Sequence, residues 1–161
     1  MILAYLSNVV KHMKRRRKLI FIDETSTDMW DIRQRIWQPK DSRLPLVIQK
    51  ANTKENKVTI IGAISLEMKS VYHQITNTTN IETVSEFFKK MSKKIDLFNK
   101  VIVMDNHAAH RSNELSEFLI SKGAIVEFLP PNCSYFNPIE TIWSWVKGKW
   151  RNQLLQVKDL S

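Results

Sequence analysis

VIVMDNHAAH, residues 101–110, begins with four consecutive apolar residues and continues into polar residues, of which the first is Asp105. An apolar run without polar interruption predicts a short strand that is covered on both faces of a sheet. Asp105 therefore lies where a buried strand ends. A carboxylate in this position is held by a rigid element but remains open to the edge of the sheet.

Two other stretches place an acidic residue at the edge of a predicted element. LIFIDE, residues 19–24, is an apolar run that reaches Asp23, and NPIE, residues 137–140, puts Glu140 in the first turn of a predicted helix. Magnesium binds one or two carboxylates and keeps room for water and phosphate, so its ligands converge from distant chain positions. The three acids therefore predict a catalytic site for phosphoryl transfer with two metal ions ~3.5–4 Å apart.

Each acid also has a simpler explanation. Asp23 and Asp105 could be turn residues whose carboxylates accept hydrogen bonds from local backbone. Glu140 lies three residues after Asn137, which is the spacing of a capping box, so it could accept a backbone amide at the start of its own helix. The coincidence of three acids in such settings favours a shared site.

Periodicity predicts the remaining elements. Apolar runs indicate strands over residues 18–23, 35–37, 57–65, 71–76, 101–105 and 125–129. Helical spacing indicates helices that begin at Asn80, Ser112 and Asn137, the first with an apolar face that extends to Phe98. This order predicts an α/β domain with a mixed sheet. If strands 18–23 and 101–105 are parallel neighbours, their terminal acids lie side by side, where ligands gather in such sheets.

These stretches resemble the catalytic domain of the mariner-like DDE transposases, including their bacterial insertion-sequence relatives. Residues 105–110 match the family's Asp-Asn-x-x-x-His segment, and residues 130–140 match its segment from Pro-Pro to Asn-Pro-Ile-Glu. The thirty-four residues between the second and third acids are typical of the same family. The resemblance covers roughly residues 18–150 and implies a ribonuclease H-like fold, in which a mixed central sheet is flanked by helices. Residues 132–136 read NCSYF where members usually carry Tyr-Ser-Pro-Asp-Leu.

The resemblance also implies roles for individual residues. Two Mg²⁺ ions, which Mn²⁺ can replace, would be bound by the three acids. Asp23 would bridge both ions, Asp105 would bind one and Glu140 the other. Asn106 and His110 would lie beside the metals, where they contact substrate phosphate or orient water.

The function that the resemblance implies is DNA transposition. Water would attack the phosphodiester at a transposon end, and the freed 3′ hydroxyl would attack target DNA in the same site, with no covalent protein intermediate. The partners would be transposon-end DNA, target DNA and a second copy of the chain in a transposition complex. Two alternatives stay open: an inactive or domesticated remnant that binds DNA, and another ribonuclease H-like metal nuclease.

Basic residues are concentrated at the beginning of the chain. The net charge is +9, and residues 1–22 contain six of the 25 Lys and Arg residues but none of the 16 acids. We expect residues 1–17 to form a basic leader ahead of a catalytic domain over residues 18–161. Three arginines of the leader are expected to contact DNA phosphates: Arg15, Arg16 and Arg17. A solvated charge run and a nuclear-import signal are the alternatives.

The last predicted helix combines tryptophans with basic residues. Trp143 and Trp150 share one helix face and are interpreted as core residues. The basic residues between and after them are expected to reach DNA phosphates: Lys147, Lys149 and Arg151.

Composition fits one globular domain. The chain has 161 residues, of which 43% are hydrophobic, and its single cysteine excludes an intramolecular disulfide and fits a reducing compartment. No apolar stretch approaches the ~20 residues of a membrane span. We therefore expect no membrane contact and no secretion, with a nuclear location in a eukaryote and a cytoplasmic or nucleoid location in a bacterium. Twenty-two residues precede Asp23, too few for the helix-turn-helix DNA-reading modules of the family, which we expect to be absent.

Overall fold

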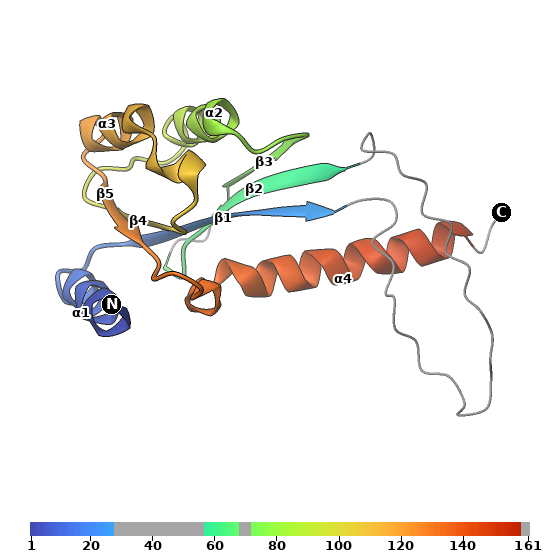
Figure 1. Cartoon of the computed structure of the whole chain (residues 1–161), viewed down its shortest axis with the longest axis horizontal. Helices are drawn as coiled ribbons and strands as arrows, with labels where there is room; N and C mark the ends of the chain where they lie inside the picture. The colour runs from blue at the N-terminus through green and yellow to red at the C-terminus, as the bar shows by residue number, and fades with distance from the viewer. Residues whose placement is uncertain (28–56, 68–71, 159–161) are drawn as a thin grey trace.

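The computed structural model describes residues 1–27, 57–67 and 72–158, which form a five-stranded sheet with helices on both faces (Figure 1). The strands are β1 (Leu19–Thr27), β2 (Val58–Ile64), β3 (Tyr72–Thr76), β4 (Val101–Met104) and β5 (Ile125–Phe128). The helices are α1 (Ile2–Lys14), α2 (Ile81–Met91), α3 (Asn113–Ser121) and α4 (Ile139–Lys158), with 3-10 helices η2 (Ala108–Arg111) and η3 (Ser134–Phe136). No helix in the described ranges is long and apolar enough to cross a membrane. The strand predicted over residues 35–37 lies outside the described residues.

The sheet is mixed, as predicted. Its strand order is β3-β2-β1-β4-β5. β2 pairs antiparallel with both β1 and β3, whereas β4 pairs parallel with both β1 and β5. β1 has nine residues and β4 has four, so β4 ends about halfway along β1. An open edge is therefore left beside the second half of β1.

Alternation along β1 separates two hydrophobic cores. Ile20 and Ile22 belong to the core beneath α2 and α3, whereas Leu19 and Phe21 belong to the core beneath α1 and α4. Figure 1 shows α2 and α3 together on one side of the sheet and α4 on the other. Because successive strand residues point to opposite faces, the next two residues of β1 also point to different layers. This places Asp23 on the α4 side and Glu24 on the side of α2 and α3.

α2 starts as predicted and ends earlier than predicted. The Asn80 side chain accepts the Thr83 amide at 2.8 Å, and the Thr83 hydroxyl accepts the Asn80 amide at 2.9 Å, so the two residues form a capping box. The helix stops at Met91, and Phe98 is mostly exposed. The predicted extension of the apolar face to Phe98 is wrong, because the chain has turned: the Asp96 carboxylate accepts the Phe98 amide at 3.0 Å.

The basic leader is an integral helix of the fold. α1 buries Tyr5 and His12 against the body of the protein. The Arg17 guanidinium donates to His12 Nδ1 at 3.1 Å and to the Asn99 side chain at 3.0 Å. Because a guanidinium has only donors, Nδ1 must accept, and Nε2 carries the proton that is donated to Glu127 at 3.0 Å. This partly buried network fixes the end of α1 to β5 and to the loop before β4.

Candidate active site

β1 and β4 bring Asp23 and Asp105 to the same part of the sheet. The two strands are parallel neighbours, and the last paired residues are Phe21 and Val103. Two residues further along, the same register places Asp105 level with Asp23. The two strands are therefore parallel neighbours as expected, but Asp23 lies in the middle of β1, which continues to Thr27, and not at the predicted end of its strand.

A glycine and a tryptophan hold the Asp23 carboxylate. Trp143 Nε1 donates to Asp23 Oδ2 at 2.9 Å from the first turns of α4. Asp23 is paired across the sheet with Gly62 of β2, and a Cβ at position 62 would lie 2.5 Å from Trp143 Cη2. Real Cβ atoms do not approach a neighbour so closely, so only glycine lets the indole lie across β2 and reach the carboxylate. Trp143 is buried in the core as predicted, and it has this polar contact in addition.

The environment of Asp23 disfavours its charged form. The pKa of Asp23 is raised from 3.8 to about 7, first by burial and then by the negative charges of Glu24 and Glu140, while hydrogen bonds from the Glu24 amide and from Trp143 partly oppose the rise. The influence of Glu140 means that its carboxylate lies close enough to interact with Asp23. A carboxyl group whose pKa is strongly raised by burial and by neighbouring acids is a common feature of functional sites.

Glu140 is brought to Asp23 by the residue that begins its motif. Asn137 Nδ2 donates to the Ile22 carbonyl at 3.1 Å, which ties the start of α4 to the backbone next to Asp23. The Asn137 amide donates to the Ser134 carbonyl at 2.7 Å. That amide is the group a capping glutamate would bind, so the capping box considered for Glu140 is not formed. The helix begins at Ile139, whereas the sequence predicts that it starts at Asn137.

Asp105 is held by the loop that follows it. Its Oδ1 accepts the His107 amide at 3.0 Å and His110 Nδ1 at 2.7 Å. The other ring nitrogen of His110, Nε2, lies 2.7 Å from Glu24 Oε1. The loop after β4 is therefore connected to β1 through a histidine between two carboxylates.

His110 carries a positive charge in this arrangement. An imidazole that contacts a carboxylate through each nitrogen donates from both, which requires the protonated ring. Burial lowers the pKa of His110, but the hydrogen bonds to Asp105 and Glu24 outweigh burial and raise it to about 10. Chiefly through the His110 hydrogen bond, the pKa of Asp105 is lowered, so this acid is ionised at neutral pH.

The position of His110 corrects one expectation. We expect from the sequence that His110 contacts substrate phosphate or orients water, but its side chain is fully buried and has no exposed surface with which to touch DNA. Asn106 is exposed beside Asp105 and remains accessible to a substrate. Glu24 was not identified from the sequence. The signal that could have found it is the alternation along β1, which turns an acid toward a buried layer where it needs a partner.

The donor set suits a hard divalent cation. Asp23, Asp105 and Glu140 offer only carboxylate oxygens, which magnesium prefers, and the raised pKa of Asp23 indicates negative charge that a cation would neutralise. In the described residues, however, no three His, Cys, Asp or Glu side chains are already arranged to hold one ion. The Asp23 carboxylate is directed to Trp143 and the Asp105 carboxylate to His110, and the charge of Glu140 acts on Asp23.

The basic residues of α4 differ in their access to solvent. Lys149 is exposed, and its ammonium lies 5.8 Å from the centroid of the exposed Trp145 ring. Lys147 and Arg151 are half-buried. Of the three, Lys149 is the one whose side chain is most open to a DNA backbone.

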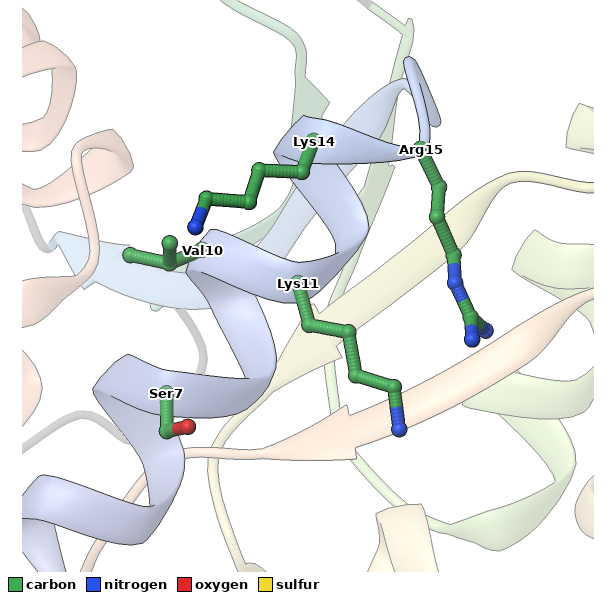
Figure 2. A pocket seen from close by; sticks show the side chains of 5 residues that line it. All are labelled: Ser7, Val10, Lys11, Lys14 and Arg15. Carbon is green, nitrogen blue, oxygen red and sulfur yellow. The ribbon is translucent and has the colours of Figure 1, made fainter.

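The beginning of the chain presents a different basic surface from the one expected. Lys11, Lys14 and Arg15, together called the α1 basic face, line a shallow hollow on α1 with Ser7 and Val10 (Figure 2). Lys11 and Arg15 extend to one side of the helix and Lys14 to the other.

Two of the three leader arginines remain open to solvent. Arg15 and Arg16 are exposed, so both stay available to DNA. Arg17 is engaged by His12 and Asn99, so its expected DNA contact is replaced by a structural role.

A family comparison agrees with this geometry. The family model described as DDE superfamily endonuclease matches residues 18–161. The chain belongs to this family. The match confirms the resemblance to DDE transposases inferred from the acid-bearing motifs, and with it the enzyme class of the domain. No curated protein sequence matches this DDE endonuclease.

Solved structures show the same fold. The Mos1 transposase in a paired-end complex with the left transposon end has a TM-score of 0.68 and 12% identity, over 91% of this chain and 46% of the Mos1 chain. A pre-cleavage Mos1 transpososome has a TM-score of 0.55 and 12% identity, over 74% of this chain and 39% of the Mos1 chain. The catalytic core domain of HTLV-2 integrase in complex with magnesium has a TM-score of 0.51 and 16% identity, over 89% of this chain and 75% of the integrase chain. The ribonuclease H-like fold is therefore confirmed, and this DDE endonuclease spans about half the length of the Mos1 chain.

Proposed function

We propose that this chain is a transposase catalytic domain that cleaves DNA at a transposon end and joins the freed 3′ hydroxyl to target DNA. The observation that supports the proposal is the parallel pairing of β1, which carries Asp23, with β4, which ends directly before Asp105, together with the hydrogen bond from Asn137, at the start of the Glu140 motif, to the Ile22 carbonyl. Family membership supports the same chemistry. Other ribonuclease H-like nucleases share the fold, but the motif from Asn137 to Glu140 favours the transposase.

The three acids would hold two Mg²⁺ ions, which Mn²⁺ can replace. Bound divalent cations ease deprotonation of the attacking hydroxyl and neutralise charge on the phosphoryl oxygens. The chain's own residues prepare the acids for this task. Trp143 fixes the Asp23 carboxylate, and Asn137 fixes the start of the helix that carries Glu140. His110 lowers the pKa of Asp105 and so keeps that acid ionised.

The DNA partner would contact exposed basic residues through its phosphates. The α1 basic face and Lys149 have no acidic partner in the described part of the chain, so their charges are available to a polyanion. Contacts of this kind position a duplex without reading its sequence. Asn106 is proposed to contact the phosphate that is cleaved, because it is exposed next to Asp105.

A second copy of the chain is a proposed partner. The Mos1 structure is a paired-end complex, and the HTLV-2 integrase core was solved in a dimeric form. We also propose that residues 1–17 and the catalytic domain over residues 18–161 act together, so that residues 1–17 are not a separable leader. α1 buries Tyr5 in the same core as β1 and α4 residues and also buries His12 against Glu127, so removing residues 1–17 would uncover that core.

The test is metal-dependent cleavage of supercoiled plasmid by the full chain. Wild-type protein with Mg²⁺ or Mn²⁺ should produce nicked and linear DNA, and chelation with EDTA should stop the reaction. Asp105→Ala should be inactive, whereas Glu117→Ala, which removes an exposed acid on α3, should cleave as wild type. Equal cleavage by wild type and Asp105→Ala would contradict the proposal.

A DNA-binding remnant is the second candidate function. The observation that favours it is that no three acids in the described ranges already surround one point. A remnant would bind plasmid through its basic residues, and it would leave the DNA intact with either metal. The same gel, combined with a mobility-shift assay, therefore separates the two candidates.

A further inference from the structure

We infer that Glu24 and His110 form a buried clamp that positions Asp105, so that a single carboxylate oxygen of this acid is presented to the metals. The inference rests on the proposed function, because it assigns these two residues a role in holding a metal ligand. Glu24 and His110 are positioning residues, since His110 is fully buried and reaches the active site only through Asp105.

The clamp engages one carboxylate oxygen of Asp105 in hydrogen bonds. Oδ1 accepts two donors, the His107 amide at 3.0 Å and His110 Nδ1 at 2.7 Å. In the described residues, Oδ2 has no hydrogen-bond partner. A carboxylate whose Oδ1 is fixed by two bonds cannot rotate freely about its terminal bond, so Oδ2 keeps one direction. Asp105 is therefore prepared to bind an ion through one oxygen.

Glu24 keeps the imidazolium of His110 in place. Its Oε1 lies 2.7 Å from His110 Nε2, and the Glu24 side chain is 15% exposed. Charge-assisted hydrogen bonds of this length are stronger and more directional than neutral ones. Glu24 also directly follows Asp23 in β1, so one strand supplies a proposed metal ligand to the α4 side and the clamp to the other side. The clamp thus fixes the position of Asp105 relative to Asp23.

A purely structural ion pair would have the same distances, and its removal would have different consequences. Loss of a structural pair would lower stability throughout the protein and leave the affinity of the folded site unchanged. Loss of a clamp would lower metal affinity even in molecules that remain folded, because ligand orientation would be lost. Replacing a hydrogen-bond partner of a metal ligand typically lowers metal affinity or activity by about 10–100-fold.

The test is Mn²⁺ affinity, measured by isothermal titration calorimetry on the folded full chain. Glu24→Ala should bind Mn²⁺ about 10–100-fold more weakly than wild type. Glu24→Gln should lie closer to wild type, because its amide oxygen can still accept from His110 Nε2. Met91→Ala is the matched control: it removes a fully buried side chain of α2, outside the clamp, and should lower stability without changing Mn²⁺ affinity.

The possible outcomes separate the clamp from the function on which it rests. Weaker binding by Glu24→Ala, restored by Glu24→Gln and absent in Met91→Ala, would support the clamp. Wild-type affinity in Glu24→Ala would overturn the clamp and leave the proposed function intact. If wild-type protein and Asp105→Ala bind Mn²⁺ equally, the metal site itself fails and the clamp fails with it.

Discussion

Replacing Asp23 with asparagine would isolate the free energy of burying its carboxylate. Its pKa is raised from 3.8 to about 7, first by burial and then by nearby negative charge. The folded protein therefore binds this proton more tightly than the unfolded chain does. The stability that Asp23 contributes is fully present below about pH 4 and is lost as the pH rises through 7. A shift of about 3 pKa units corresponds to about 4 kcal/mol at 1.36 kcal/mol per unit.

The assay is urea denaturation of wild type and Asp23→Asn in EDTA, followed by tryptophan fluorescence at several pH values. Asparagine can still accept from Trp143, so the comparison changes charge more than geometry. We expect Asp23→Asn to be more stable than wild type by up to about 4 kcal/mol at pH 8, and the difference to shrink toward zero near pH 4. A difference that does not change with pH would refute the reasoning.

Three further predictions address the same site and the DNA surface. Gly62→Ala should lower the free energy of unfolding, measured by chemical denaturation, by about 1–3 kcal/mol, because the added Cβ overpacks against the Trp143 indole. Gly148→Ala is the control and should be neutral or stabilising, because nothing lies within 4 Å of its added Cβ. Glu140→Gln should keep wild-type stability and lose plasmid cleavage, and retained cleavage would remove Glu140 from the metal ligands. Glutamine at the three positions of the α1 basic face should reduce the salt dependence of DNA binding, measured by fluorescence anisotropy, by about 0.9 in slope for each lost phosphate contact; an unchanged slope would exclude this surface.

The sequence was sufficient for the parts of the fold that depend on local pattern. The structure confirms, within a few residues, the strand predicted from the apolar run before Asp105 and the helix starts predicted at Asn80 and Ser112. The parallel pairing of the strand that carries Asp23 with the strand that precedes Asp105 was considered from the sequence, and the structure shows it. The continuation of β1 beyond Asp23 was not predicted.

The parts that were missed depend on contacts between distant residues. The bond between Glu24 and His110 joins positions 86 residues apart, and it exists only because η2 folds back over the middle of β1. The role of Gly62 depends on a strand register that places it opposite Asp23. Neither fact has a local signal, because register and layer packing are properties of the assembled sheet.

The beginning of the chain shows the same limit. A run of basic residues suggested a leader that contacts DNA, and composition could not reveal that Tyr5 and His12 anchor it to the core. Arg17 became part of that anchor through Asn99, which lies 82 residues away. The positive charge of this segment was recognised from the sequence. Which of its basic residues contact the body of the protein and which face solvent was not.

The central claim is that Asp23, Asp105 and Glu140 together bind the catalytic metals. The most direct measurement is a crystal structure of the full chain with Mn²⁺, in which anomalous scattering locates the ions independently of the protein atoms. The account predicts Mn²⁺ at the edge between β1 and β4, bound by carboxylate oxygens of all three acids and by Oδ2 of Asp105 in particular. Strong anomalous peaks away from these carboxylates, with none between them, would contradict it.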